Sequence, residues 1–122
     1  MKFIIPVEPR TKKNSQRIVM AGKYPKILPS KQYEEFEAQA LWYIEALGID
    51  YPVNIKAIFY MKTKRRVDLV NLLEALDDVL VKAGAITDDN ANIIKSHDGS
   101  RVRHDKDNPR IEIEIERSID ED

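Results

Sequence analysis

Residues 68–83 read DLVNLLEALDDVLVKA, and this stretch predicts an amphipathic helix around which the rest of the fold is organised. At 100° per residue its leucines and most of its other apolar residues fall on one broad arc, so one side of the helix is expected to face a core. Asp68 stands where an aspartate caps the start of a helix, and Gly84 stands where a glycine ends one. Both ends of the helix are therefore predicted, as well as its buried side.

The segments on either side of this helix have strand patterns. Val53–Met61 begins with strict alternation of apolar and polar residues and is expected to be a strand that leads toward the helix. Ile111–Glu116 alternates isoleucine with glutamate, which predicts a strand with one face in the core and one acidic face in water. Ile93–His97 is expected to pair with Arg101–Arg103 as a hairpin that turns at Asp98-Gly99.

The N-terminal half predicts a strand, a hairpin and another helix. Phe3–Val7 reads as a short buried strand, and Arg17–Met20 with Tyr24–Leu28 as the two strands of a hairpin. Ser30 is expected to cap a helix whose apolar stripe runs from Tyr33 to Leu47 and which ends at the following glycine.

Taken in order, these elements predict a single α+β domain over residues 1–122. Its sheet is expected to be mixed and mostly antiparallel, closed by an antiparallel meander, with two helices packed on it. Trp42 lies on the first predicted helix and is expected in the core or in a dimer contact.

Charge is unevenly distributed, although 20 basic and 21 acidic residues give a formal net charge of −1. Residues 1–31 contain eight lysines and arginines but one acid, Glu8, and residues 62–66 form a second basic cluster. These clusters are expected to attract the phosphates of a polyanion, although runs of charge are often only solvated surface. The chain has no cysteine for disulfides or thiolate metal sites and no apolar stretch of about 20 residues, so we expect a cytoplasmic protein without membrane contact.

Three carboxylates on two different elements are candidates for a metal site. Asp68 lies at the start of the predicted helix, and Asp88 and Asp89 lie in the loop beyond its end. Magnesium prefers hard oxygen ligands, and a metal held by carboxylates can activate water and stabilise the leaving oxygen in phosphodiester cleavage. Each residue also has a structural interpretation, Asp68 as a helix cap and residues 88–90 as a turn.

Residues 65–90 resemble the RusA family of Holliday-junction resolvases, small endonucleases of bacteria and their phages. The family hallmark is a basic stretch leading into Asp-Leu-Asp-Asn-Leu, then a helix and an Asp-Asp pair in the following loop. The first motif is matched by Asp68, Leu69, Asn71 and Leu72, and the second by Asp88 and Asp89. Residues 12–15, Lys-Lys-Asn-Ser, also resemble the family's early asparagine-containing loop.

Two positions depart from the family pattern. Val70 occupies the place of the second motif aspartate, and Glu74 occupies the place of a lysine that is important for activity in the best-known members. Because valine cannot bind a metal, two expectations stay open. Either Glu74 joins Asp68, Asp88 and Asp89 as a catalytic metal ligand, or the protein binds branched DNA without efficient cutting. Glu74 lies about 120° around the helix from Asp68 and about 9 Å along it, and its structural interpretation is an exposed helix glutamate.

The resemblance implies a homodimeric endonuclease that depends on magnesium, with manganese as a substitute. Its members make paired, symmetric cuts at a four-way DNA junction in recombination and repair, and the setting is a bacterium or a prophage. A two-fold dimer would match the symmetry of the junction. The predicted DNA contacts are Lys12, Lys13, Asn14, Arg17, Lys64, Arg65, Arg66 and Asn71. A protein-interaction module using the acidic tail is a further alternative, with no motif in its favour.

Overall fold

Two long strands form the centre of the sheet because each alternates apolar with polar residues. Strands β4 (Val53–Met61) and β7 (Arg110–Arg117) pair antiparallel, and the register sets buried Ile55 opposite buried Ile115. Strand β1 (Lys2–Ile5) pairs antiparallel with the other edge of β7, slightly earlier in the chain than predicted. The computed structural model describes residues 1–12, 17–28 and 30–119, without the side chain of residue 17.

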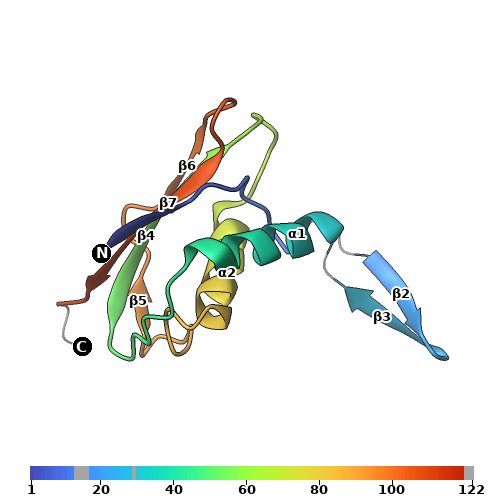
Figure 1. Ribbon diagram of the computed structural model, residues 1–122, viewed down its shortest axis with the longest axis horizontal. Coiled ribbons are helices and arrows are strands. Elements are labelled where there is room, and N and C mark those ends of the chain that lie inside the picture. Colours follow the sequence, from blue (N-terminus) through green and yellow to red (C-terminus); the bar gives the residue numbers. More distant parts are fainter. Residues whose placement is uncertain (13–16, 29, 120–122) are drawn as a thin grey trace.

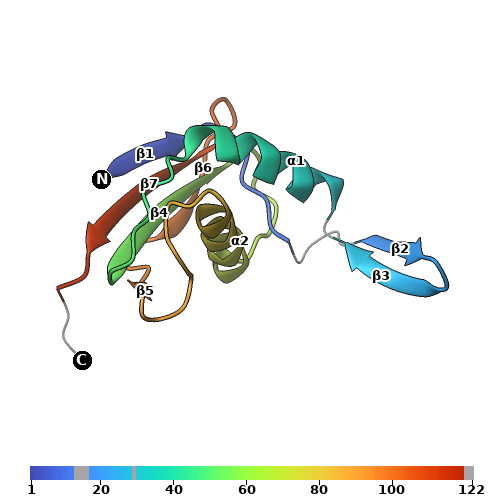
Figure 2. The same ribbon diagram turned by 60° about the horizontal axis from the view of Figure 1, so that its bottom comes forward.

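Both long helices cover the same face of this sheet, as Figures 1 and 2 show, which confirms the predicted arrangement. Helix α1 (Lys31–Ala40) buries Phe36, and helix α2 (Leu69–Lys82) buries Leu76 against the apolar face of the sheet. Gly84 follows α2 with a φ of 78°, a left-handed conformation that suits glycine at a helix end. In the described part of the chain, no helix is long and apolar enough to cross a membrane.

The edge of the sheet beside β4 differs from the predicted hairpin. Strands β5 (Ile94–Ser96) and β6 (Arg101–His104) each pair parallel with β4, so the predicted antiparallel pairing between them was wrong. Side chains connect the intervening segment to β4. The Asn54 side-chain oxygen accepts the Asp98 N–H at 2.8 Å, and the Ser100 hydroxyl accepts a β4 backbone N–H at 3.0 Å. The sheet is nevertheless mixed and mostly antiparallel, as predicted.

The first helix is shorter than its apolar stripe predicts. Ser30 caps α1 as expected, but the helix ends at the 3₁₀ turn η1 (Leu41–Tyr43), after which Ile44 is extended. The Ile49 N–H then donates to a backbone carbonyl beyond the end of α2, so the chain gains tertiary hydrogen bonds that a longer helix would lose. Trp42 is 87% exposed, so its predicted place in the core was wrong, and the alternative of a dimer contact stays a prediction.

A hairpin projects from the body of the protein next to the start of α1. Strands β2 (Arg17–Ala21) and β3 (Tyr24–Leu28) pair with each other in a separate two-stranded sheet, as predicted. Figures 1 and 2 show this hairpin extending away from the main sheet in both views. We call it the β2–β3 arm.

Candidate functional site

Asp68 caps helix α2, in agreement with its structural interpretation. Its Oδ1 accepts the backbone N–H of Val70 at 2.8 Å and, more weakly, that of Asn71 at 3.4 Å. These groups are among the N–H donors that the first turn of a helix leaves without intrahelical partners. Both bonds use the same carboxylate oxygen, so the cap does not engage Oδ2. A second role for Asp68 as a metal ligand stays a prediction.

The first two turns of α2 place the two departures from the family pattern near the surface. Val70 is 68% exposed, so an apolar side chain faces solvent beside the Asp68 cap. Glu74 is also exposed. Burial of the Tyr33 phenol on α1 raises its pKa most, and the charge of Glu74 raises that pKa a little further. The Glu74 side chain is therefore close enough to α1 to act on it electrostatically.

Asp88 and Asp89 lie in the exposed loop between α2 and β5. The Asp88 Oδ1 accepts the Asp89 backbone N–H at 2.7 Å, and its Oδ2 accepts the side-chain amide of Asn90 at 3.1 Å. Both bonds are local to residues 88–90, which form part of an exposed loop. The interpretation of this segment as a turn stays a prediction.

The Asp89 carboxylate interacts electrostatically with the second half of α2. Partial desolvation raises its pKa, and the neighbouring Asp88 and Asp78 carboxylates raise it further. Asp78 itself lies about 15 Å along the helix axis from Asp68, so the part of α2 that acts on Asp89 is not the part that Asp68 caps. Among the residues that the structure describes, no group of three or more histidine and acidic side chains is arranged to hold a metal ion. The joint ligand set of Asp68, Glu74, Asp88 and Asp89 stays a prediction.

A histidine and a half-buried aspartate link the sheet to this half of α2. His97 Nδ1 donates to the Ile55 carbonyl at 3.0 Å, because a carbonyl oxygen only accepts, and Nε2 lies 2.9 Å from Asp77 Oδ2. A proton must lie between Nε2 and the carboxylate for that bond to form. Burial alone would lower the pKa of His97, but the bond to Asp77 raises it. Burial raises the pKa of Asp77, against the effect of His97.

A basic groove lies at the other end of α2. It runs between residues 8–11 and residues 61–67, and it also touches the start of α1. Its basic lining residues are Arg10, Lys62, Arg65 and Arg66. Glu8 pairs with Arg10 at 3.0 Å, and the lining ends at Val67 and Leu72, on either side of Asp68 in the sequence. Positive side chains and the helix N-terminus, which also favours anions, therefore lie together.

The predicted DNA contacts occupy different places. Arg65 and Arg66 line the groove, and Lys64 is exposed in the same loop. Asn71 is half-buried in the first turn of α2. Lys12 lies over the second half of α2, where its Nζ is 2.5 Å from an Asp78 oxygen. Lys13 and Asn14 lie outside the described residues, as does the side chain of Arg17.

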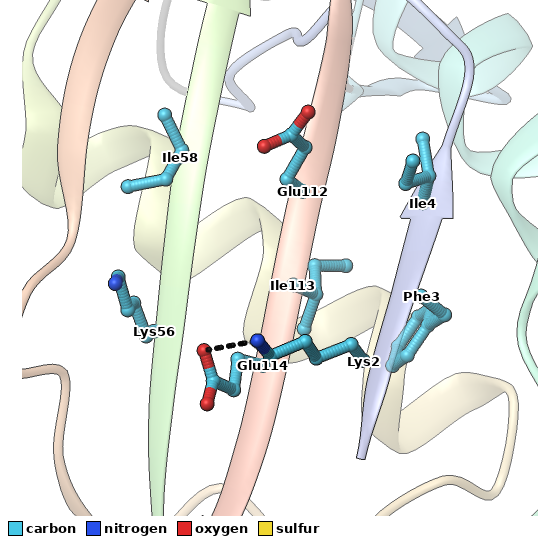
Figure 3. Close-up of a pocket in the computed structure, with 8 residues that line it drawn as sticks. All are labelled: Lys2, Phe3, Ile4, Lys56, Ile58, Glu112, Ile113 and Glu114. Carbon is cyan, nitrogen blue, oxygen red and sulfur yellow. Dashed lines mark ion pairs between the residues drawn. The ribbon is translucent and has the colours of Figure 1, made fainter.

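A separate hollow on the uncovered face of the sheet contains none of the predicted site residues. Figure 3 shows charged side chains there on neighbouring strands, including the ion pair between Lys2 and Glu114 at 4.0 Å. Opposite charges that are paired within the chain are typical of a sheet face in water. The groove beside α2 is therefore the better candidate for a binding site, because its basic residues outnumber the acids.

Comparison with known proteins connects this geometry to a family. Residues 6–116 match the family described as Endodeoxyribonuclease RusA. The chain belongs to the RusA family. A RusA relative from Aquifex aeolicus (strain VF5), named Crossover junction endodeoxyribonuclease RusA, is 28% identical over 92 residues, which cover 72% of each chain. The RusA match includes the basic groove, α2 and the aspartate loop, so the suspected resemblance is confirmed.

Several residues in or near the candidate site were not singled out from the sequence. Arg10 enters the groove from a segment far from Arg65 in the chain, and its signal was the excess of basic residues near the N-terminus. His97 and Asp77 belong to none of the sequence motifs above, since the first lies in a predicted strand and the second in the predicted helix. Their sequence separation gave no local signal that they would meet.

Proposed function

We propose that this chain is a metal-dependent endonuclease that resolves four-way DNA junctions by paired, symmetric phosphodiester cleavage. The observation that carries this proposal is the basic groove, which leads to the capped start of α2 in a chain of the RusA family. The name of the Aquifex relative supports a crossover junction as the substrate. We place the activity in DNA recombination and repair in the cytoplasm of a bacterium, or in a prophage that it carries.

The proposed metal is magnesium, with manganese as a substitute. The candidate ligands Asp68, Glu74, Asp88 and Asp89 offer carboxylate oxygens, the donors that magnesium prefers, although the described structure does not gather three of them into one cluster. When bound, the ion would supply an activated water and stabilise the charge of the leaving oxygen. The chain itself holds the DNA backbone with the groove arginines and orients the Asp68 carboxylate through the helix cap.

The paired cuts require two sites, so we propose that two copies of the chain act as a homodimer. A two-fold dimer presents one groove to each of two equivalent strands of the junction. Each copy then needs a single metal site and a single groove.

The test is incubation of the protein with a labelled four-way junction and a linear duplex of the same sequence, with magnesium, manganese or chelator. We expect paired nicks in the junction only, and only with metal. Light scattering on the same protein measures whether it is a dimer. Cutting of both DNAs at equal rates would refute junction specificity, and cutting in chelator would refute the metal requirement.

A second candidate function is binding of branched DNA without efficient cleavage. The exposed Val70 favours it, because the family motif has a carboxylate at this place and valine offers no oxygen to a metal. This candidate predicts tight, salt-sensitive junction binding and no product with either metal. Metal-dependent nicks that disappear in Asp68→Asn would exclude it.

A further inference from the structure

The β2–β3 arm has an apolar face that no other described element covers. Antiparallel partners lie on the same face of a hairpin, and the register pairs Ile18 with Ile27 and Met20 with Pro25. Ile18, Met20 and Ile27 are 72%, 66% and 65% exposed. A two-stranded hairpin is marginally stable alone, and exposed apolar patches commonly mark binding surfaces. A partner for this face is therefore expected.

The charge of the arm indicates the chemistry of that partner. Residues 17–28, which form the arm, contain no acidic residue and three basic ones, Arg17, Lys23 and Lys26. Lys23 lies at the turn, and Lys26 lies on the face opposite the apolar one, with exposed Tyr24. A surface with basic and aromatic side chains and no acid complements a polyanion with stackable bases.

The position of the arm connects it to the basic groove. Thr11 and Ser30 both line the groove, and the arm is the part of the chain that leaves after the first and returns before the second. A nucleic acid in the groove would therefore pass the base of the arm.

We infer that the β2–β3 arm is a second DNA contact that recognises the branch point of a junction. Its lysines bind backbone phosphates, while Ile18, Met20 and Ile27 pack against bases that are unstacked at the crossover. When the arm is inserted into a branch point, DNA lies on both sides of it, so its apolar face can contact bases while its lysines contact phosphates. A linear duplex keeps its bases stacked and offers the apolar face nothing equivalent. Apolar side chains of these types are used by other DNA-binding proteins as wedges between base steps. This inference rests on the proposed junction substrate.

The experiment compares three variants with the wild type in chelator, where the proposed cleavage does not occur. Ile18→Thr with Ile27→Thr makes two of the three exposed apolar side chains of this face polar, and Lys23→Gln with Lys26→Gln removes the charge of both lysines of the arm. Ile4→Thr is the matched control, because Ile4 is a half-exposed strand isoleucine on the uncovered face of the main sheet. Binding is measured on a four-way junction with 2-aminopurine at the crossover and on a linear duplex. Light scattering gives the oligomeric state, and circular dichroism checks folding.

The double threonine variant is expected to lose about tenfold in junction affinity, with less than about a twofold change on the duplex. The rise in 2-aminopurine fluorescence on binding, which reports unstacking, should disappear with it. The double glutamine variant should weaken binding to both DNAs and reduce the slope of log affinity against log salt by roughly two. The Ile4→Thr control should behave as the wild type.

Other results would overturn the inference. If the wild type and the double threonine variant bind junctions equally well and unstack the crossover bases equally, the apolar face does not touch DNA. Conversion of a wild-type dimer to monomers by the threonine variant would identify the occupant as a second copy of the chain. Absence of junction binding by the wild type would refute the proposed function and this inference together.

Discussion

The two halves of helix α2 lie in opposite electrostatic surroundings. Its first turn, capped by Asp68, lies beside a groove lined with arginines. Its second half carries Asp77 and Asp78, which interact with the aspartate loop and are partly balanced by His97 and Lys12. The comparison teaches that one helix separates a phosphate-attracting surface from a carboxylate-rich one. The proposed phosphate-binding surface therefore lies at the start of the helix, and most of its acidic charge lies at the other end.

The largest expected effect comes from Asp68→Asn. Asparagine is as good a helix cap as aspartate, so folding should be preserved. The loss of a proposed metal ligand should lower the cleavage rate by about 10²–10³-fold, while junction binding stays equal or improves because a negative charge near phosphate is removed. The measurement is single-turnover cleavage of a labelled junction together with binding in chelator. Unchanged cleavage in a folded variant would limit Asp68 to its capping role.

The next effect concerns the carboxylate-rich half of the helix. His97→Asn should lower the free energy of unfolding at pH 6 by about 1–2 kcal/mol, because a half-buried, charge-assisted hydrogen bond to Asp77 is lost. Urea unfolding of the wild type and the variant at several pH values measures this difference.

The pH dependence of that difference has a defined sign. The pKa values of His97 and Asp77 are both raised in the folded protein, and Asp78, Asp89 and the Ile55 carbonyl are the other charged or polar groups that act on the pair. The stability from the His97 bond is therefore complete below the unfolded histidine pKa of about 6.5 and is lost as the pH rises through the folded value. If the difference in free energy of unfolding between the wild type and His97→Asn grew above pH 7, a proton held between His97 and Asp77 would not be its source.

The basic half is tested by Arg65→Gln with Arg66→Gln. Removal of two phosphate contacts should weaken junction binding by about tenfold at moderate salt and reduce the salt slope by roughly two. Fluorescence anisotropy over a series of salt concentrations gives both values. The control is Arg101→Gln with Arg103→Gln, which removes equal charge from exposed positions on β6 that do not line the groove. Equal loss in both variants would indicate a general charge effect instead of a groove.

The smallest effect is a gain. Val70→Asp restores a carboxylate at an exposed position one turn from Glu74, and it should raise metal-dependent cleavage about threefold if the site lacks a ligand. Val70→Asn is the matched control, because asparagine is nearly the same size as aspartate but carries no charge. Equal rates in the two variants would show that a missing carboxylate at this position does not limit the reaction.

Much of the fold was predictable because it follows from local patterns. The cap at Asp68, the stop at Gly84 and the alternation in β4 and β7 depend on residues close together in the chain, and each prediction was confirmed. The turn at Asp98-Gly99 was misread because its composition suits a hairpin, while the bonds of Asn54 and Ser100 hold this segment along β4. The first helix was predicted too long because residues after η1 remain apolar for packing without being helical.

The candidate site divides in the same way. The sequence alone determined the family motif around Asp68, the two departures from it and the excess of basic residues near the N-terminus. Only the tertiary structure decided that Arg10 joins Arg65 and Arg66 in one groove and that His97 bonds to Asp77. A capping or alternation signal is read from near neighbours along the chain, whereas these contacts join distant segments whose meeting depends on how the whole core packs.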